Sequence, residues 1–174
     1  MRLSPLALLR RYQPTDLREQ DFLQRMVALA AAPESWQRSH YVPGHFTASS
    51  FVFSPDYSQV ALIFHPRFGR WLQPGGHIEA EDVDLWAAAR REVTEELGIS
   101  ALEPLQEGLW DIDIHDIAAR KAEPAHQHFD LRFAFVAPVG PLNGELQAQW
   151  VSLARAGELE SDESVQRGLA KIFR

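Results

Sequence analysis

Three closely spaced glutamates, Glu92, Glu95 and Glu96, are the residues of this chain whose types and spacing most clearly indicate chemistry. At positions i, i+3 and i+4 of a helix they share one face and lie within side-chain reach of each other. Like charges at this spacing destabilise a helix by about 0.2–0.5 kcal/mol per pair, and the helix dipole disfavours anions near the C-terminus. A hard divalent cation such as Mg²⁺ or Mn²⁺ takes oxygen ligands and bridges to phosphates, so it would offset both penalties. The alternative is a solvated acidic helix face.

The helix that must carry these glutamates is predicted over about Asp82–Leu97. Apolar residues recur with helical spacing from Leu85 onward, and Gly98 is typical of the position just past a helix end. Gly75 and Gly76 precede the helix, where the lack of side chains lets the backbone approach a ligand closely.

The nine residues Arg91–Ile99, REVTEELGI, resemble the second half of the Nudix box at every specified position. In that motif a glycine, five residues, a glutamate and seven residues precede Arg-Glu-aliphatic-x-Glu-Glu-x-Gly-aliphatic. The first half in this chain, from Gly76 onward, is one residue longer than the motif. The position of the first glutamate falls on Val83 or on Asp82, depending on the direction of counting. Whether Asp82 or Asp84 replaces that glutamate stays open.

Resemblance to the Nudix hydrolase family implies an α/β (α+β) fold: an α/β/α sandwich with a mixed central sheet and the box as a loop–helix–loop. It implies a metal-dependent hydrolase that cleaves the pyrophosphate linkage of a nucleoside diphosphate joined to another moiety. The cofactor would be Mg²⁺ or Mn²⁺, and the partner a small-molecule nucleoside diphosphate derivative.

The resemblance also implies roles for the matching residues. Glu95 and Glu96 would be the main metal ligands, and the carbonyl oxygen of Gly75 a further one. Glu92 would be a ligand or the general base. Arg91 would orient Glu92 through a charge-assisted hydrogen bond.

Two further expectations concern the surroundings of these residues. Gly76 would shape the loop before the helix. Many family members supply another carboxylate from a loop beyond the box, and Glu145 is the first candidate by position, followed by Asp111 and Asp113. A solvent-exposed loop residue is the alternative for Glu145.

Histidines form the second unusual feature of the sequence. His126, His128 and Asp130 alternate, so on a strand they would share one face, with His115 nearby. Such a group fits a transition-metal site or contact with a substrate phosphate, and the alternative is a polar strand face. His77, which follows the glycine pair, is a candidate to face the site.

The remaining candidates are basic and aromatic. Arg67 and Arg70 precede the glycine pair and are candidates for phosphate contact, with plain surface residues as the alternative. Four aromatic residues could either stack on a base or pack in the core, and packing in the core is the more common role of such residues. They are Phe68, Trp71, Trp110 and Phe129. Three histidines are expected to be ordinary polar or core residues: His40, His45 and His65.

Strands and helices that can position these residues are predicted on both sides of the central helix. Alternating or apolar runs between turn residues predict strands over His45–Ser54, Gln59–Phe64, Arg70–Gln73, Leu105–Ile114, Gln127–Pro138 and Gln147–Ser152. Further helices are predicted over Asp16–Ala31, with Thr15 as its cap, and over Ser161–Phe173, with Ser161 as its cap. This mixed pattern is typical of a layered α+β or α/β domain.

Composition bounds the remaining possibilities. A chain of 174 residues with 45% hydrophobic and 24% charged residues fits one globular domain. The net charge of −7 argues against bulk nucleic-acid binding. The absence of cysteine excludes disulfides and thiolate nucleophiles and agrees with a cytoplasmic location. We expect no membrane partner, because no apolar run approaches the ~20 residues of a membrane span.

The N-terminal residues 1–44 are expected to form a helical leader packed on a hydrolase domain at residues 45–174. The apolar run Leu3–Leu9 is interrupted by Pro5 and followed by two arginines, so it indicates a packing segment rather than a signal peptide. Whether the leader covers one edge of the domain or helps to form a homodimer stays open.

Two other functional classes compete with the hydrolase. A catalytically weak Nudix-fold module that binds nucleotides and regulates is the first, but such modules usually have a broken Arg-Glu…Glu-Glu pattern, which is intact here. The isomerase branch of the fold relies on a cysteine, which this chain lacks.

Overall fold

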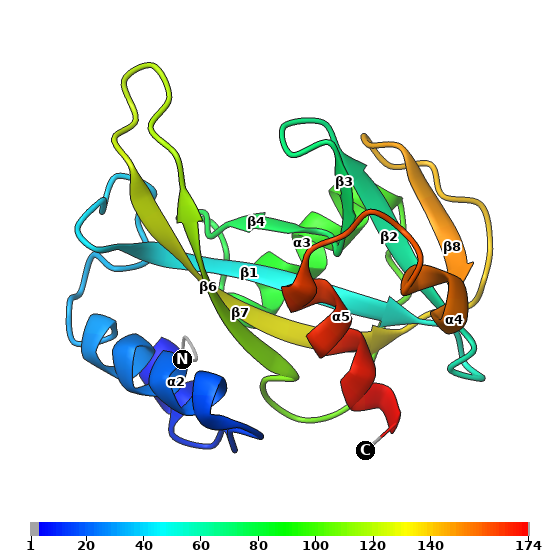
Figure 1. The fold of residues 1–174 in the computed structure, drawn as a ribbon, viewed down its shortest axis with the longest axis horizontal. Coiled ribbons are helices and arrows are strands. Elements are labelled where there is room, and N and C mark those ends of the chain that lie inside the picture. Colours follow the sequence, from blue (N-terminus) through cyan, green and yellow to red (C-terminus); the bar gives the residue numbers. More distant parts are fainter. Residues whose placement is uncertain (1–3, 174) are drawn as a thin grey trace.

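The computed structural model describes residues 4–173, and a mixed sheet with helices on its faces forms the body of this region (Figure 1). The strands are β1 (Gly44–Phe53), β2 (Gln59–His65), β3 (Arg70–Leu72), β4 (Gly75–His77), β5 (Glu103–Pro104), β6 (Asp111–Ile117), β7 (His126–Val136) and β8 (Ala148–Ser152). Their order is β3-β2-β1-β7-β5, with β4 on β1, β6 on β7 and β8 on β2. The predicted mixed sheet between helices is confirmed.

Two long strands form the centre of the sheet. β1 and β7 run parallel over their whole pairing, from Gly44 opposite Gln127 to Phe53 opposite Val136. β1 and β2 pair only next to their connecting turn and then diverge, and β3 pairs with β2 while β4 pairs with β1. The segment that carries the two glycines is therefore a strand held in the sheet, rather than a free loop.

The box helix lies against one face of this sheet (Figure 1). It is α3 (Leu85–Leu97), three residues shorter at its start than predicted, because Asp84 is the N-cap and accepts a hydrogen bond from the Ala87 N–H. Its end is as predicted: Gly98 adopts φ 75°, the left-handed conformation that glycine tolerates best.

The other helices are α1 (Pro5–Leu9), α2 (Leu17–Leu29), α4 (Leu153–Ala156), α5 (Glu163–Ala170) and the 3₁₀ helix η1 (Lys171–Phe173). α1 lies within the predicted packing segment and buries Leu8 and Leu9, whereas Leu3 lies outside the described residues. α2 is capped by Asp16 and not by Thr15, whose hydroxyl donates to Glu19 instead. Among residues 4–173, no helix has the length and apolar character needed to cross a membrane.

Other boundaries also differ from prediction, three of them as follows. The N-cap of α5 is Asp162 instead of Ser161, and the Asp162 side chain makes no capping hydrogen bond. β6 begins at Asp111 instead of Leu105, because the chain turns through Gly108 at φ 83° before it. β7 begins one residue before the predicted strand, which brings His126 into the pairing with β6.

Successive side chains of β1 point to opposite faces of the sheet, and the two faces have different surroundings. Phe46 and Val52 on one face pack with α3, whereas Phe51 on the other packs with α5. Each such side chain, fully buried, contributes about 1.5–3 kcal/mol. On the α5 face the aromatic residues occupy only the C-terminal half of β1, and polar side chains occupy the half that begins with His45.

Candidate active site

Strand β4 lies directly on the carboxylates of α3. A Cβ atom added at Gly76 would lie 2.6 Å from Glu92 Oε1, so a side chain at this position would displace the Glu92 carboxylate. The Gly75 N–H donates to Glu96 Oε2 at 2.9 Å. The glycine pair thus brings backbone within contact distance of two of the predicted metal ligands.

Arg91 holds this group together. It donates to Glu92 Oε1 at 2.9 Å, to Glu95 Oε2 at 3.1 Å and to the carbonyl oxygen of His77 at 2.8 Å. Its Nε and Nη2 atoms also donate to the two carboxylate oxygens of Asp82, at 3.1 and 3.0 Å. The orienting contact between Arg91 and Glu92 is present in the structure.

Asp82, and not Asp84, is the acid that contacts Arg91. Asp84 caps α3, and Val83 between them is 69% exposed. Asp82 is buried and also accepts from the Glu79 N–H at 2.8 Å, which fixes the turn before the helix. The extra residue in the first half of the box is accommodated in this turn.

A fourth acid, the exposed Glu145 in the loop before β8, lies close enough to the group to affect the pKa of Glu96. The Glu145 N–H donates to the Glu95 carbonyl oxygen at 2.8 Å, and the Asn143 N–H donates to the Leu97 carbonyl oxygen at 3.2 Å. These bonds satisfy carbonyl groups that a helix end leaves free. A Cβ atom at Gly144 would lie 2.2 Å from the backbone of Glu96, so the loop is pressed against the helix.

The carboxylates of this group outnumber the positive charges that pair with them. The pKa of Glu96 is raised to about 7: burial is the largest cause, the bond from the Gly75 N–H opposes the rise, and the carboxylates of Glu92, Glu95 and Glu145 add to it. Burial also raises the pKa of Glu92, although Arg91 counteracts this. Arg91 pairs with Glu92 and Glu95 but not with Glu96.

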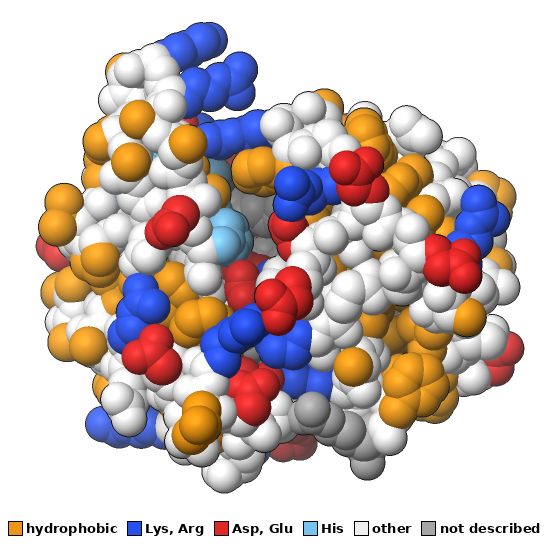
Figure 2. All heavy atoms as spheres, viewed as in Figure 1, with side chains coloured by type: hydrophobic (Ala, Val, Ile, Leu, Met, Phe, Trp, Pro, Cys, Tyr) orange, Lys and Arg blue, Asp and Glu red, His pale blue; other side chains and the backbone are white. Residues whose placement is uncertain are grey.

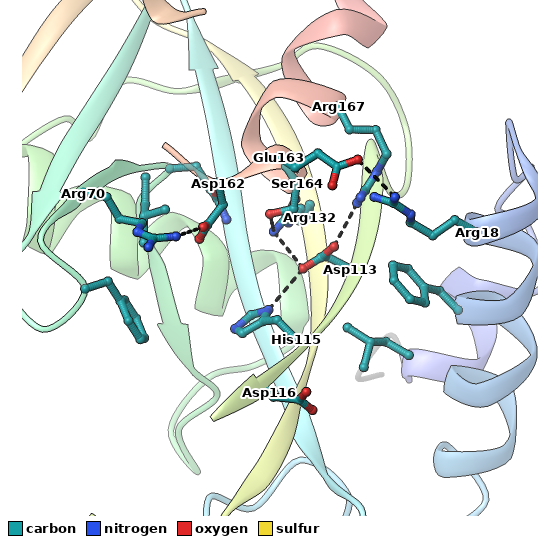
Figure 3. Close-up of a pocket in the computed structure, with 15 residues that line it drawn as sticks. Arg18, Arg70, Asp113, His115, Asp116, Arg132, Asp162, Glu163, Ser164 and Arg167 are labelled. Atoms are coloured by element: carbon teal, nitrogen blue, oxygen red, sulfur yellow. Dashed lines mark hydrogen bonds and ion pairs between the residues drawn. The ribbon is translucent and has the colours of Figure 1, made fainter. Parts of the chain in front are cut away.

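Asp111 and Asp113, the other candidates for an additional carboxylate, belong to a different group. Arg132, which is 2% exposed, lies 3.1 Å from Asp111, 3.4 Å from Asp113 and 2.8 Å from Asp130. Arg167 of α5 contacts Asp113 at 3.0 Å (Figure 3). It also contacts Asp111, at 3.2 Å. Burial raises the pKa of Asp113, but Arg132 and His115 outweigh it, so the net shift is downward.

A cavity of about 510 Å³ opens on the polar half of this sheet face, between α2, α5 and β3 (Figure 3). Its lining includes Phe68, which is 41% exposed, together with Gln73, His115 and Arg18. Arg70, a predicted phosphate contact, lines it too and forms an ion pair with Asp162. Of the aromatic candidates, Phe129, Trp71 and Trp110 pack in or against the core, so Phe68 alone lines this cavity.

Five histidines gather on the same polar face, and pale-blue side chains are visible in the hollow of Figure 2. Their rings are neighbours with centroids 4.9–5.4 Å apart: His45, His77, His115, His126 and His128. The predicted shared face of His126, His128 and Asp130 is confirmed by the β6–β7 register, in which His115 lies opposite His128.

Burial disfavours the charged form of three of these histidines. Burial lowers the pKa of His45 and of His77 to about 4, and it lowers the pKa of His128 as well. His77 turns away from α3, since Gly76 before it faces Glu92 and side chains alternate along a strand. His45 was predicted only as an ordinary polar or core residue; its parallel pairing with His128 is a long-range contact that local patterns do not reveal.

Comparison with known proteins agrees with this geometry. The NUDIX domain model matches residues 44–172. Among solved structures, the NUDIX domain of Shewanella oneidensis NrtR complexed with ADP ribose is 17% identical with a TM-score of 0.55, covering 74% of this chain and 85% of that chain. The Escherichia coli dihydroneopterin triphosphate pyrophosphohydrolase is 18% identical with a TM-score of 0.58, covering 72% and 92%. The Caenorhabditis elegans Ap4A hydrolase is 17% identical with a TM-score of 0.54, covering 74% and 95%.

No curated protein sequence matches the chain significantly. The domain match nevertheless spans well over half of the chain and includes the whole box, the glycine strand and the Glu145 loop. The chain therefore belongs to the Nudix family of hydrolases.

Proposed function

We propose that this Nudix hydrolase cleaves the pyrophosphate linkage of a nucleoside diphosphate joined to another moiety, with Mg²⁺ or Mn²⁺ as cofactor. The observation that carries the proposal is the contact of Glu92 and Glu96 with the glycine strand β4, with the carboxylates of Glu95 and Glu145 close enough to raise the pKa of Glu96. A solvated acidic helix face would not half-bury Glu92 and Glu96 or press a backbone strand against them.

The donor set fits a hard divalent cation. Its atoms are carboxylate and carbonyl oxygens, the ligands that Mg²⁺ and Mn²⁺ prefer. Glu95, Glu96 and the Gly75 carbonyl would hold the ion, and its positive charge would offset both the burial and the repulsion that raise the pKa of Glu96. When bound, such an ion neutralises charge on the pyrophosphate oxygens and favours ionisation of a bound water.

The protein's own residues supply orientation. Arg91 fixes the Glu92 carboxylate by a charge-assisted bond, and Asp82 fixes Arg91 from its other side. A carboxylate held in this way either ligates the ion or accepts a proton from the attacking water. Both roles need the same fixed geometry.

The cavity on the sheet face is our proposed site for the nucleoside and the leaving group. Phe68 offers an exposed ring for stacking, and Arg70 offers positive charge for a phosphate. The solved relatives whose names include ADP ribose and Ap4A support nucleotide derivatives as the class to screen.

The test is a phosphate-release screen over nucleoside triphosphates, nucleotide sugars and dinucleotides, with Mg²⁺, with Mn²⁺ and with a chelator. We expect metal-dependent turnover of at least one compound and its loss on chelation. Glu95→Gln and Glu96→Gln should each lower kcat by about 100-fold or more, since each removes a proposed metal ligand and the loss of even an outer partner of a metal costs about 10–100-fold.

Glu107→Gln is the matched control, because Glu107 is an exposed acid whose pairing with Arg11 lies on the surface. Turnover that persists in Glu95→Gln and Glu96→Gln would refute the metal assignment. Tight nucleotide binding without turnover of any compound would instead favour a binding and regulatory module.

A further inference from the structure

The histidines nearest the centre of the sheet form a compact trio on three strands. His45 lies on β1, His77 on β4 and His128 on β7, and the strand register places His45 directly opposite His128. One ring nitrogen from each lies within 4.8 Å of the other two. Their ring centroids are 5.1, 4.9 and 5.2 Å apart.

His45 carries a buried nitrogen atom that has no partner. Its Nδ1 lies 3.2 Å from the carbonyl oxygen of His40, so this nitrogen donates and the lone pair is left on Nε2. The residue is 0% exposed, and Nε2 makes no hydrogen bond. The large majority of buried side-chain polar atoms are paired in proteins, so an unpaired one at a cluster of possible ligands indicates a missing partner.

The contacts of the trio match those of metal-binding imidazoles. A histidine that ligates a metal usually donates its other ring N–H to a backbone carbonyl or a carboxylate, as His45 does toward His40. The rings of His77 and His128 make no hydrogen bond within residues 4–173, which leaves their nitrogens available. The backbone under His77 is held in place, because its carbonyl oxygen accepts from Arg91 at 2.8 Å.

We propose that His45, His77 and His128 bind a divalent transition-metal ion, with Zn²⁺ as the first candidate. Three imidazole nitrogens suit Zn²⁺, Ni²⁺ or Cu²⁺ and do not suit Mg²⁺. A tetrahedral Zn²⁺ with Zn–N bonds of about 2.0–2.1 Å holds its nitrogens about 3.3 Å apart, a short movement from the observed spacing. The fourth position is left for water or an anionic oxygen.

This site is distinct from the carboxylate group on α3. Gly76 faces Glu92, whereas the next residue along the strand, His77, faces the opposite side of the sheet. The two sites also differ in ligand type, because one offers oxygen atoms and the other nitrogen atoms. β4 therefore separates a hard-cation site from an imidazole site, and Arg91 contacts both through Glu92 and the His77 carbonyl.

The test is zinc binding by the full-length protein without a histidine tag, after removal of metals with a chelator. Zinc titration against a chromophoric chelator and elemental analysis of the dialysed protein should give one ion per chain. Co²⁺ should give the visible absorption of a tetrahedral nitrogen-ligated ion. His77→Gln and His128→Gln should each weaken zinc binding more than about 100-fold, since loss of even an outer partner costs 10–100-fold.

Two matched controls separate the sites. His65→Gln removes a half-buried histidine that is not one of the three, and Glu96→Gln removes a carboxylate ligand of the other site. Both should keep the zinc stoichiometry and the Co²⁺ absorption. Circular dichroism of each variant shows that it is folded, and His77→Gln is the safer variant because His77 is only half-buried on a short strand, whereas His45 is fully buried.

Three results would overturn the proposal. One is a folded wild-type protein that binds no zinc after metal removal. Another is equal zinc affinity in the wild type, His77→Gln and His128→Gln. A third is loss of zinc in Glu96→Gln with retention in the histidine variants, which would place the ion on the carboxylates.

Discussion

At the scale of single residues, Arg91 connects acidic side chains of the box with the turn before the helix. Asp82 accepts from Arg91 through both carboxylate oxygens, while Asp84 caps the helix. We predict that Asp82→Asn lowers kcat about 10-fold or more, because a charge-assisted bond contributes about 1.5–3 kcal/mol and each 1.36 kcal/mol is tenfold in rate. Asp84→Asn should change little, since asparagine caps a helix as well as aspartate. Steady-state kinetics on the substrate found in the screen measure both.

Equal losses in the two variants would contradict the assignment of Asp82. Urea unfolding of both supplies the control, since a loss of kcat caused by unfolding would appear as a lower midpoint. Asp82→Asn keeps one oxygen atom for the Glu79 N–H, so the turn should survive the change.

Sequence patterns predicted the residues of the box well and their partners less well. The spacing of Glu92, Glu95 and Glu96 depends only on the helix, so it could be predicted locally. The choice between Asp82 and Asp84 depends on how a turn folds back toward the helix, and the motif does not encode it. His45 is harder still, because its contact with His128 depends on a parallel pairing between strands about 80 residues apart in sequence.

At the scale of elements, the loop before β8 closes the end of α3. Gly144 lies so close to Glu96 that an added Cβ would be 2.2 Å from its backbone, while nothing lies within 4 Å of a Cβ added at Gly140. We predict that Gly144→Ala destabilises the protein by about 1–3 kcal/mol through overpacking and lowers kcat by moving Glu145. Gly140→Ala should leave both quantities nearly unchanged. Urea unfolding and steady-state kinetics measure the pair.

A Gly144→Ala variant as stable and active as Gly140→Ala would show that the loop does not press on the helix.

The fold at this scale was predicted where a pattern is local, as in α3 and β7. The strand β4 was not predicted. Its sequence is typical of a glycine loop, and it is a strand only because it pairs with β1.

At the scale of the whole molecule, one buried network joins the N-terminal helices to the C-terminus. Lys171 lies 2.7 Å from Glu19 and 2.6 Å from Asp111, and it donates to the Tyr12 hydroxyl at 2.7 Å. Tyr12 in turn donates to Glu19 at 2.8 Å. Tyr12 and Glu19 lie before residue 44, where the family match begins. The N-terminal residues 1–44 therefore contact the matched region through these charged and polar side chains, and also through the packing of α2 on β6. The division into a leader and a domain stays a prediction.

The network was not visible in the sequence, because its members are single charged residues on helices and strands far apart in the chain. Lys171 and Glu19 each look like a solvated charge in a polar stretch. Only the folded arrangement shows that both are buried and that each is the other's partner. The one local sign was the alternation of charged residues, Asp111 and Asp113 on β6 and Asp130 and Arg132 on β7. Residues opposite each other on paired strands share a face, so these four side chains meet.

Glu19 provides the test of this network. Burial raises the pKa of Glu19, but hydrogen bonds from Lys171, Thr15 and Tyr12 outweigh it and lower the pKa below its ordinary value. A carboxyl whose folded pKa is depressed stabilises the protein above its unfolded pKa of about 4.3, and this contribution is lost as the pH falls further. We predict that Glu19→Gln lowers the free energy of unfolding by about 3–5 kcal/mol at pH ~7, because it leaves Lys171 buried with one fewer partner.

The difference between wild type and Glu19→Gln should stay constant from pH ~7 to ~5 and shrink below pH ~4, as the wild type loses the charge that the variant never had. Taking the difference at each pH removes the contribution of the buried histidines, which both proteins share. Glu163→Gln, at an exposed ion pair with Arg18, is the control and should be nearly neutral throughout. Urea unfolding across this pH range measures all three proteins, and a difference that grows toward acid would mean that the charge of Glu19 opposes folding.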